Sequence, residues 1–201
     1  GRNGLSVVEL PQGFRSYVTN LGVKDDTDDF VVVATDAPVP SAAVFTKSRF
    51  AGPSVTLSRQ HMADGQAQAV VVISKNANVA TGQSGIDDAH TVTGIVAERL
   101  GCDPSDIVLT STGVIGRRYP IERMAVGLRD IPRPLAGIDA DGPARAMMTT
   151  DTVSKLASAS ISSATGGARI VGMAKGVGMI EPDMATHISM LFTDAAIDSA
   201  E

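Results

Sequence analysis

The sequence predicts an α/β domain built around a mixed or antiparallel sheet. Short apolar runs of strand length recur along the 201 residues, and the clearest is Ala-Val-Val-Val-Ile-Ser at residues 69–74. Other segments carry apolar residues at helical spacing. Several strands follow one another too closely for a helical crossover, so we expect antiparallel pairs in the sheet.

The expected elements follow from local pattern. Apolar runs indicate strands at 30–35, 42–46, 54–57, 69–74, 106–110, 156–161, 168–173 and 187–193. Helical spacing with Gly101 at its end indicates a helix over 87–100. Pro120 and Pro143 suit the first turns of helices over 120–128 and 142–148. The strands at 156–161 and 168–173 should form a hairpin around residues 165–167 (Thr-Gly-Gly), and the acidic cluster at 25–29 should form a turn.

Composition disfavours several classes of protein. The net charge of −5 disfavours a nucleic-acid binder, because phosphate binding needs clustered Lys and Arg. Cys102 is the single cysteine, so neither an intrachain disulfide nor a Cys-rich metal site can form. The three histidines lack ligand spacing, and no apolar run approaches ~18 residues. We expect a soluble, cytoplasmic protein with no metal, no cofactor and no membrane or nucleic-acid partner.

Four polar segments stand beside apolar runs. They cover residues 75–82, 110–116, 148–152 and 173–186, and each is rich in Gly, Thr, Asn or Ser. Such loops expose backbone N–H groups and hydroxyls, which stabilise the oxyanions of acyl transfer. Taken singly, each is also compatible with an ordinary turn or helix cap.

The fourth segment leads through a Gly-rich turn and Pro182 to Ala185, Thr186 and a strand. A threonine at the start of a strand suits an N-terminal nucleophile. An N→O acyl shift at the Ala185–Thr186 bond would free the α-amine of Thr186. With an ordinary pKa of ~7.7–8, that amine could serve as base for the threonine's own hydroxyl. From this pattern alone, a simple turn before a strand remains the alternative.

Together the four segments resemble the ornithine acetyltransferase family, also called glutamate N-acetyltransferase. That family carries Asn-Ala-Asn-x-x-Thr-Gly, Ser-Thr-Gly-x-Ile-Gly, Met-Thr-Thr-Asp, and Lys-Gly-x-Gly-Met-Ile followed by Pro-x-Met-Ala-Thr. All four occur here in the family's order between residues 76 and 186. The stretch 50–55 and the Asn-Ala-Asn-Val-Ala-Thr-Gly variant are most similar to the paralogue of clavulanic acid gene clusters.

The resemblance implies a mixed-sheet layered sandwich of the N-terminal-nucleophile-like ornithine acetyltransferase type. It also implies self-cleavage between Ala185 and Thr186. Residues 1–185 would form an α-subunit-like domain, and residues 186–201 would begin a β subunit of the same precursor. Such subunits would assemble into a heterotetramer or a larger complex.

The resemblance further implies an arginine-biosynthesis reaction and the groups that perform it. Thr186 would take the acetyl group from N-acetylornithine and pass it to glutamate in ping-pong order, with acetyl-CoA open as a further donor. The Thr112 hydroxyl and the Gly113 N–H would form the oxyanion hole. Thr150 and Lys175 would bind substrate.

One departure from the family keeps other functions open. The family's β subunit runs far beyond the nucleophile, whereas residues 186–201 are all that follow Ala185 here. We therefore expect an N-terminal half that is inactive without the β portion. The alternatives are a non-catalytic binding or assembly module, and an N-terminal-nucleophile amidase that hands the acyl group to water.

Overall fold

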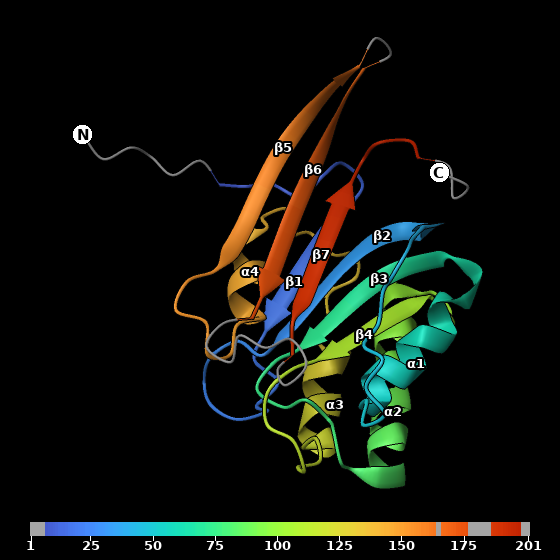
Figure 1. Ribbon diagram of the computed structural model, residues 1–201, viewed down its shortest axis with the longest axis vertical. Coiled ribbons are helices and arrows are strands. Elements are labelled where there is room, and N and C mark those ends of the chain that lie inside the picture. Colours follow the sequence, from blue (N-terminus) through green and yellow to red (C-terminus); the bar gives the residue numbers. More distant parts are fainter. Residues whose placement is uncertain (1–6, 164–165, 177–185, 198–201) are drawn as a thin grey trace.

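The elements form three stacked layers in a computed structural model, which describes residues 7–163, 166–176 and 186–197 (Figure 1). Three helices cover one face of a four-stranded sheet, and a three-stranded sheet covers its other face. This arrangement confirms the layered sandwich with a mixed sheet.

The first sheet has the strand order β1–β2–β3–β4. Its strands are β1 (Arg15–Thr19), β2 (Phe30–Pro40), β3 (Gln66–Ile73) and β4 (Ile107–Ser111). β1 and β3 both pair antiparallel with β2, whereas β3 and β4 are parallel. The parallel pair requires a long crossover, and helix α2 (Gly82–Leu100) supplies it.

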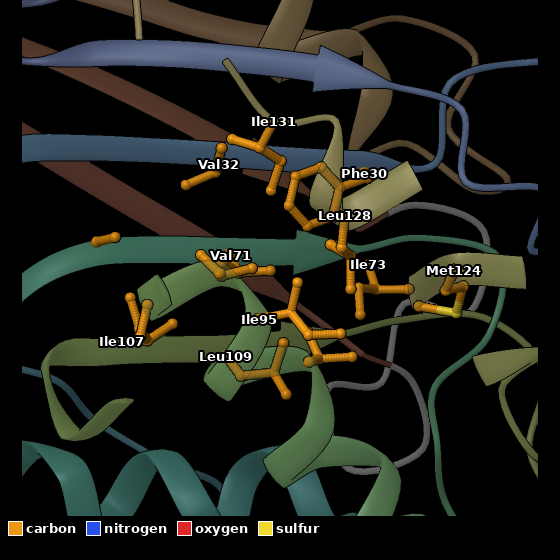
Figure 2. Close-up of a cluster of buried hydrophobic side chains, with 14 of the residues drawn as sticks. Phe30, Val32, Val71, Ile73, Ile95, Ile107, Leu109, Met124, Leu128 and Ile131 are labelled. Carbon is orange, nitrogen blue, oxygen red and sulfur yellow. The ribbon is translucent and has the colours of Figure 1, made fainter. Parts of the chain in front are cut away.

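The alternation of side chains along β2 builds both cores. Phe30 and Val32 face the helices, and Val31 and Val33 face the second sheet, because successive strand residues point to opposite sides. The helical core packs α1 (Pro53–His61), α2 and α3 (Ile121–Arg129) against the first sheet. Figure 2 shows its centre, where Ile95 and Leu128 lie among strand side chains.

The second sheet has the order β5–β6–β7, and all its pairs are antiparallel. Its strands are β5 (Lys155–Ser163), β6 (Gly166–Lys175) and β7 (Ile188–Thr193). The side chains of Val171, Met173 and Phe192 are buried against the first sheet together with residues of helix α4 (Asp141–Ala146). Single 3₁₀ turns, η1 (Met62–Asp64) and η2 (Pro104–Asp106), complete the elements.

Most of the expected elements occur within one to five residues of their predicted bounds. Gly101 ends α2 with φ 76°, and its N–H donates to the carbonyl of Ala97 at 2.7 Å, as a left-handed cap does. The predicted hairpin is β5–β6, whereas Thr165 of its predicted turn lies outside the described residues.

Two of the predicted strands are wrong. Residues 54–57 lie in α1, where Pro53 occupies the first turn and the buried Ser54, Leu57 and Ser58 share one face at helical spacing. Residues 42–46 have no regular structure and pair with no strand in the described part of the chain. Arg59 of α1 holds this segment instead, donating to the Thr46 carbonyl at 2.9 Å.

Candidate functional site

A cavity of about 1160 Å³ is lined by residues near the ends of β3, β4 and β6 and the start of β7. Figure 1 shows that these ends of the strands lie together at one side of the two sheets. The predicted site residues Thr112, Gly113, Thr150, Lys175 and Thr186 all line the cavity. They come from three of the four polar segments, so the fold brings together residues that lie far apart in the sequence. The other residue of the predicted cleavage bond, Ala185, lies outside the described residues.

The loops after β3 and β4 form one wall of the cavity. These strands are parallel, so both end at the same edge of the sheet. The N–H of Ala77 donates to the Val114 carbonyl at 2.9 Å, and the N–H of Val114 donates to the Lys75 carbonyl at 3.2 Å. These bonds fix the Thr112–Gly113 segment against the neighbouring loop.

Gly113 is required by this close approach. Its φ is +135°, and a Cβ at this position would lie 2.1 Å from the carbonyl carbon of Lys75. Backbone atoms cannot yield to such a contact, so a side chain would force the two loops apart. The glycine therefore keeps its backbone at the cavity wall.

The two asparagines of the Asn-Ala-Asn loop hold its shape from within. Asn76 donates through Nδ2 to the carbonyls of Arg117 and Arg118 at 3.1 and 3.2 Å. Asn78 donates through Nδ2 to the Gly85 carbonyl at 2.8 Å. Both side chains are buried, so these bonds satisfy amide groups that would otherwise be costly to bury.

A hydroxyl chain supports the loop after β4 from beneath. Ser111 forms hydrogen bonds with Tyr119 and, at 2.5 Å between oxygens, with Ser54 of α1. Desolvation of the buried phenol raises the pKa of Tyr119 to about 12, despite the opposing hydrogen bonds from the serines. The phenol therefore stays protonated and anchors Ser111, the residue next to Thr112.

Lys75 joins the acidic cluster to the cavity wall. Its Nζ lies 2.7 Å from Asp25 Oδ1 and 2.6 Å from the carbonyl of Thr27, and it also donates to the Thr27 hydroxyl. The hydrogen bond from Lys75 lowers the pKa of Asp25 well below its usual range. The cluster predicted to form a turn is thus also part of the cavity lining.

Lys175 at the end of β6 is the buried cation of the site. Its Nζ donates to Thr112 Oγ1 at 3.0 Å and to Thr149 Oγ1 at 2.7 Å. The residue is 4% exposed, and desolvation lowers the pKa of its amine while the charge of Asp151 opposes that effect. The amine thus connects the second sheet to the loop after β4.

Asp151 is the carboxylate that faces this amine, 3.9 Å from Lys175 Nζ to the nearer oxygen. It accepts hydrogen bonds from Lys155 Nζ at 2.7 Å and from the N–H groups of Gly176 and Thr149 at 2.9 and 3.3 Å. Desolvation raises the pKa of Asp151, but these hydrogen bonds and the charge of Lys175 outweigh it and lower the pKa to about 2. Asp151 is therefore ionised at neutral pH.

The sequence-based prediction did not assign functions to several residues of the cavity. Thr149 and Asp151 lie in a segment that is compatible with a helix cap or turn, and Lys75 begins a polar loop. Arg145 of α4 was not singled out, although it is an exposed cation on the cavity wall. Their local sequence gave no sign of these contacts. Within the described ranges, no cluster of three or more His, Cys, Asp or Glu could hold a metal.

The family is decided by a match over most of the chain. The model of the ArgJ family matches residues 15–201. The chain belongs to the ArgJ family. The resemblance inferred from the four motifs is thereby confirmed.

Curated relatives in the family match almost the whole chain. It is 52% identical over 195 residues to the arginine biosynthesis bifunctional protein ArgJ 2 of Nostoc, covering 97% of this chain and 49% of the relative. It is 49% identical over 197 residues to the glutamate N-acetyltransferase Oat2 of Streptomyces clavuligerus, with 98% and 49% covered. The chain therefore spans about half the length of these relatives.

Two solved structures share the fold. The crystal structure of an ArgJ protein from Bacillus halodurans superposes with a TM-score of 0.79 at 29% identity, covering 90% of this chain and 95% of that one. An ornithine acetyltransferase from Mycobacterium tuberculosis, in complex with ornithine, gives a TM-score of 0.71 at 27% identity, with 89% and 94% covered. In the described part of this chain, no helix has the length and apolar character needed to cross a membrane.

Proposed function

We propose that this protein is the part of a glutamate N-acetyltransferase that carries the nucleophile and the oxyanion hole. It transfers acetyl from N-acetylornithine to glutamate in ping-pong order through an acetyl ester on Thr186. The nucleophile arises by self-cleavage at Ala185–Thr186, and a β subunit from the same precursor completes an assembly of heterotetramer size or larger. The observation that carries this proposal is the single cavity lined by all five candidate residues.

The chemistry follows from the position of each group. The Thr186 hydroxyl adds to the acetyl carbonyl carbon while its proton passes to the threonine's own α-amine. The carbonyl oxygen becomes an oxyanion, which accepts hydrogen bonds from the Thr112 hydroxyl and the Gly113 N–H. Breakage of the carbon–nitrogen bond releases ornithine, whose amine takes the proton. The amine of glutamate then attacks the ester by the reverse sequence and regenerates Thr186.

Several properties of the cavity support this assignment. Thr186 is exposed, and only His187 lies between it and β7, so its position is tied to the second sheet. Gly113 approaches the opposite loop without a side chain, which leaves its backbone at the cavity wall. The names of the relatives from Nostoc and Streptomyces clavuligerus, and the ornithine in the Mycobacterium tuberculosis structure, support the substrate class.

Intact-mass measurement on the protein as its source produces it tests the proposal. We expect cleavage before Thr186, and a mass increase of one acetyl group on the fragment that begins with Thr186 after incubation with N-acetylornithine. Glutamate should remove the added group and appear as N-acetylglutamate. Acetyl-CoA in place of N-acetylornithine tests the second donor.

Two matched variants test whether the reaction depends on Thr186 in particular. Thr186→Ala should abolish both cleavage and the acetyl adduct. Thr91→Ala, at an exposed threonine on α2 outside the cavity, should change neither. An uncleaved protein with full transferase activity would contradict the mechanism, and release of free acetate in place of N-acetylglutamate would favour the amidase.

A further inference from the structure

We propose that Lys175, held by Asp151, fixes the Thr112 hydroxyl as a hydrogen-bond acceptor, so that the hydroxyl's own proton points into the cavity. This inference rests on the proposed function, because it concerns the oxyanion hole of that reaction. Thr112 is the catalytic group, and Lys175 and Asp151 are positioning residues that act through it.

The direction of the hydrogen bond is decided by the chemistry of the ammonium group. A charged lysine has three N–H donors and no acceptor, so Thr112 Oγ1 at 3.0 Å must accept from it. Among the described residues, Lys175 is the one side chain that bonds to the Thr112 hydroxyl. The proton of Thr112 is therefore left for a group in the cavity that Thr112 lines.

A neutral Lys175 would not impose this orientation. A neutral amine carries a lone pair and can accept the proton of Thr112, which would turn the donor away from the cavity. The acceptor role of Thr112 thus depends on the charge of Lys175. Burial at 4% exposure works against that charge, so a compensating anion is needed.

Asp151 supplies the compensating charge. Its side chain is fully buried, and one of its oxygens lies 3.9 Å from Lys175 Nζ. The N–H groups of Gly176 and Thr149 bind the carboxylate, and these two residues adjoin or contact Lys175. The carboxylate therefore sets both the charge and the position of the amine.

Lys155 acts against Asp151 at the same amine. It holds Asp151 Oδ1 at 2.7 Å through a side chain that is 36% exposed. Its positive charge lowers the pKa of Lys175, whereas the negative charge of Asp151 raises that pKa. Other titratable or charged groups line the cavity or adjoin it: Lys24, Asp25, Asp28, Lys75, Arg145, the α-amine of Thr186 after cleavage, and His187, which lies against Gly176.

Two single variants should therefore move the pH profile in opposite directions. Asp151→Asn removes the charge that keeps Lys175 protonated, so the alkaline limb of kcat should move to lower pH. Lys155→Gln removes a like charge, so the same limb should move to higher pH. All other groups around the cavity are unchanged in both variants, and simple structural damage has no reason to produce opposite shifts.

The loss should appear in kcat more than in KM, because the oxyanion contact forms only in the transition state. At pH values above its alkaline limb, Asp151→Asn should lower kcat by roughly 10²-fold, as the loss of an oxyanion donor does. In a Thr112→Val background the same change should have little further effect, because its target is already gone. Asp88→Asn, at another buried carboxylate that pairs with a cation, Arg118, is the matched control and should leave the limb in place.

The experiment is a pH profile of acetyl transfer by the natural protein and these variants. The inference is supported if the alkaline limbs of Asp151→Asn and Lys155→Gln move in opposite directions. It is also supported if the effects of Asp151→Asn and Thr112→Val on kcat are not additive. Limbs that stay or move together, or an additive cycle, overturn it while the proposed function stands. If Asp151→Asn fails to fold, an unmoved or lowered limb in Lys155→Gln alone overturns it. A wild-type protein without any acetyl transfer overturns the proposed function, and this inference with it.

Discussion

Lys175 Nζ and Thr112 Oγ1 lie 3.0 Å apart, although 63 residues separate them in the chain. Lys175 ends β6 of the second sheet, and Thr112 follows β4 of the first. The contact therefore joins the two sheets at the cavity. The packing of Val31 and Val33 against Val171 and Met173 fixes the distance between the sheets, so the core between them also sets the geometry of the site.

The hydroxyl of Thr112 should be essential where its methyl group is not. Thr112→Val keeps the shape of the side chain but removes the donor, and we expect kcat to fall roughly 10²–10³-fold. Thr112→Ser restores the hydroxyl and should retain most of the activity. Steady-state rates of N-acetylglutamate formation measure both variants. Equal activity of the valine and serine variants would show that this hydroxyl has no part in catalysis.

Gly113 and Gly116 lie in the same loop and should differ sharply in their tolerance of alanine. Both have positive φ, +135° and +73°. A Cβ on Gly113 would clash with the Lys75 backbone, whereas a Cβ on Gly116 would meet nothing within 4 Å. We expect Gly116→Ala to lower the free energy of unfolding by about 1–2 kcal/mol, for its left-handed backbone alone.

Gly113→Ala should cost more, because backbone strain of about 1–3 kcal/mol adds to the clash and to displacement of the two loops. Urea unfolding of both variants gives the comparison. A Gly113→Ala protein as stable as Gly116→Ala would mean that the loops after β3 and β4 can separate freely, contrary to the close approach described above.

Local pattern was sufficient to predict the strongly periodic elements. The buried strand at residues 69–74 and the helix ending at Gly101 follow from apolar spacing and from the left-handed conformation that glycine favours. The segment at 54–57 was mispredicted because four residues are too few to distinguish a buried strand from one turn of an amphipathic helix. Pro53 was the signal for the helix.

The site was predictable only as separate pieces. Family motifs indicated Thr112, Gly113, Thr150, Lys175 and Thr186, and the fold places them around one cavity. The contacts between charged groups could not be predicted in the same way. Lys75 and Asp25 are 50 residues apart, and nothing in either local sequence encodes their meeting. Such pairs depend on how the strands pair, which local periodicity does not specify.

Tyr119 should ionise at a higher pH than an exposed tyrosine, because its phenol is buried. Desolvation raises its pKa to about 12, so a spectrophotometric titration of the protein's two tyrosines should contain a step near that pH. Tyr119→Phe should delete this step. It should also lower the free energy of unfolding by about 1 kcal/mol, because Ser111 loses one hydrogen-bond partner. A late step that persists in Tyr119→Phe would contradict the assignment.

Protonation of Asp151 at low pH should lower the free energy of unfolding. Its pKa falls from 3.8 to about 2 in the folded protein, because hydrogen bonds from Lys155 and two backbone N–H groups outweigh desolvation. A depressed pKa contributes stability that is fully present above about pH 4 and is lost as the pH falls through about 2. The difference corresponds to about 2 kcal/mol.

Urea unfolding between pH 5 and pH 2 on wild-type and Asp151→Asn protein isolates this contribution, because all other carboxylates are common to both. The stability of the variant should fall less steeply over this interval. Lys155→Gln removes one of the bonds that hold the carboxylate ionised, so its loss of stability should begin at higher pH than in the wild type. Parallel curves for all three proteins would mean that Asp151 binds its proton equally well in the folded and unfolded chains. The hydrogen bonds would then not hold the Asp151 carboxylate beside Lys175 in its ionised form.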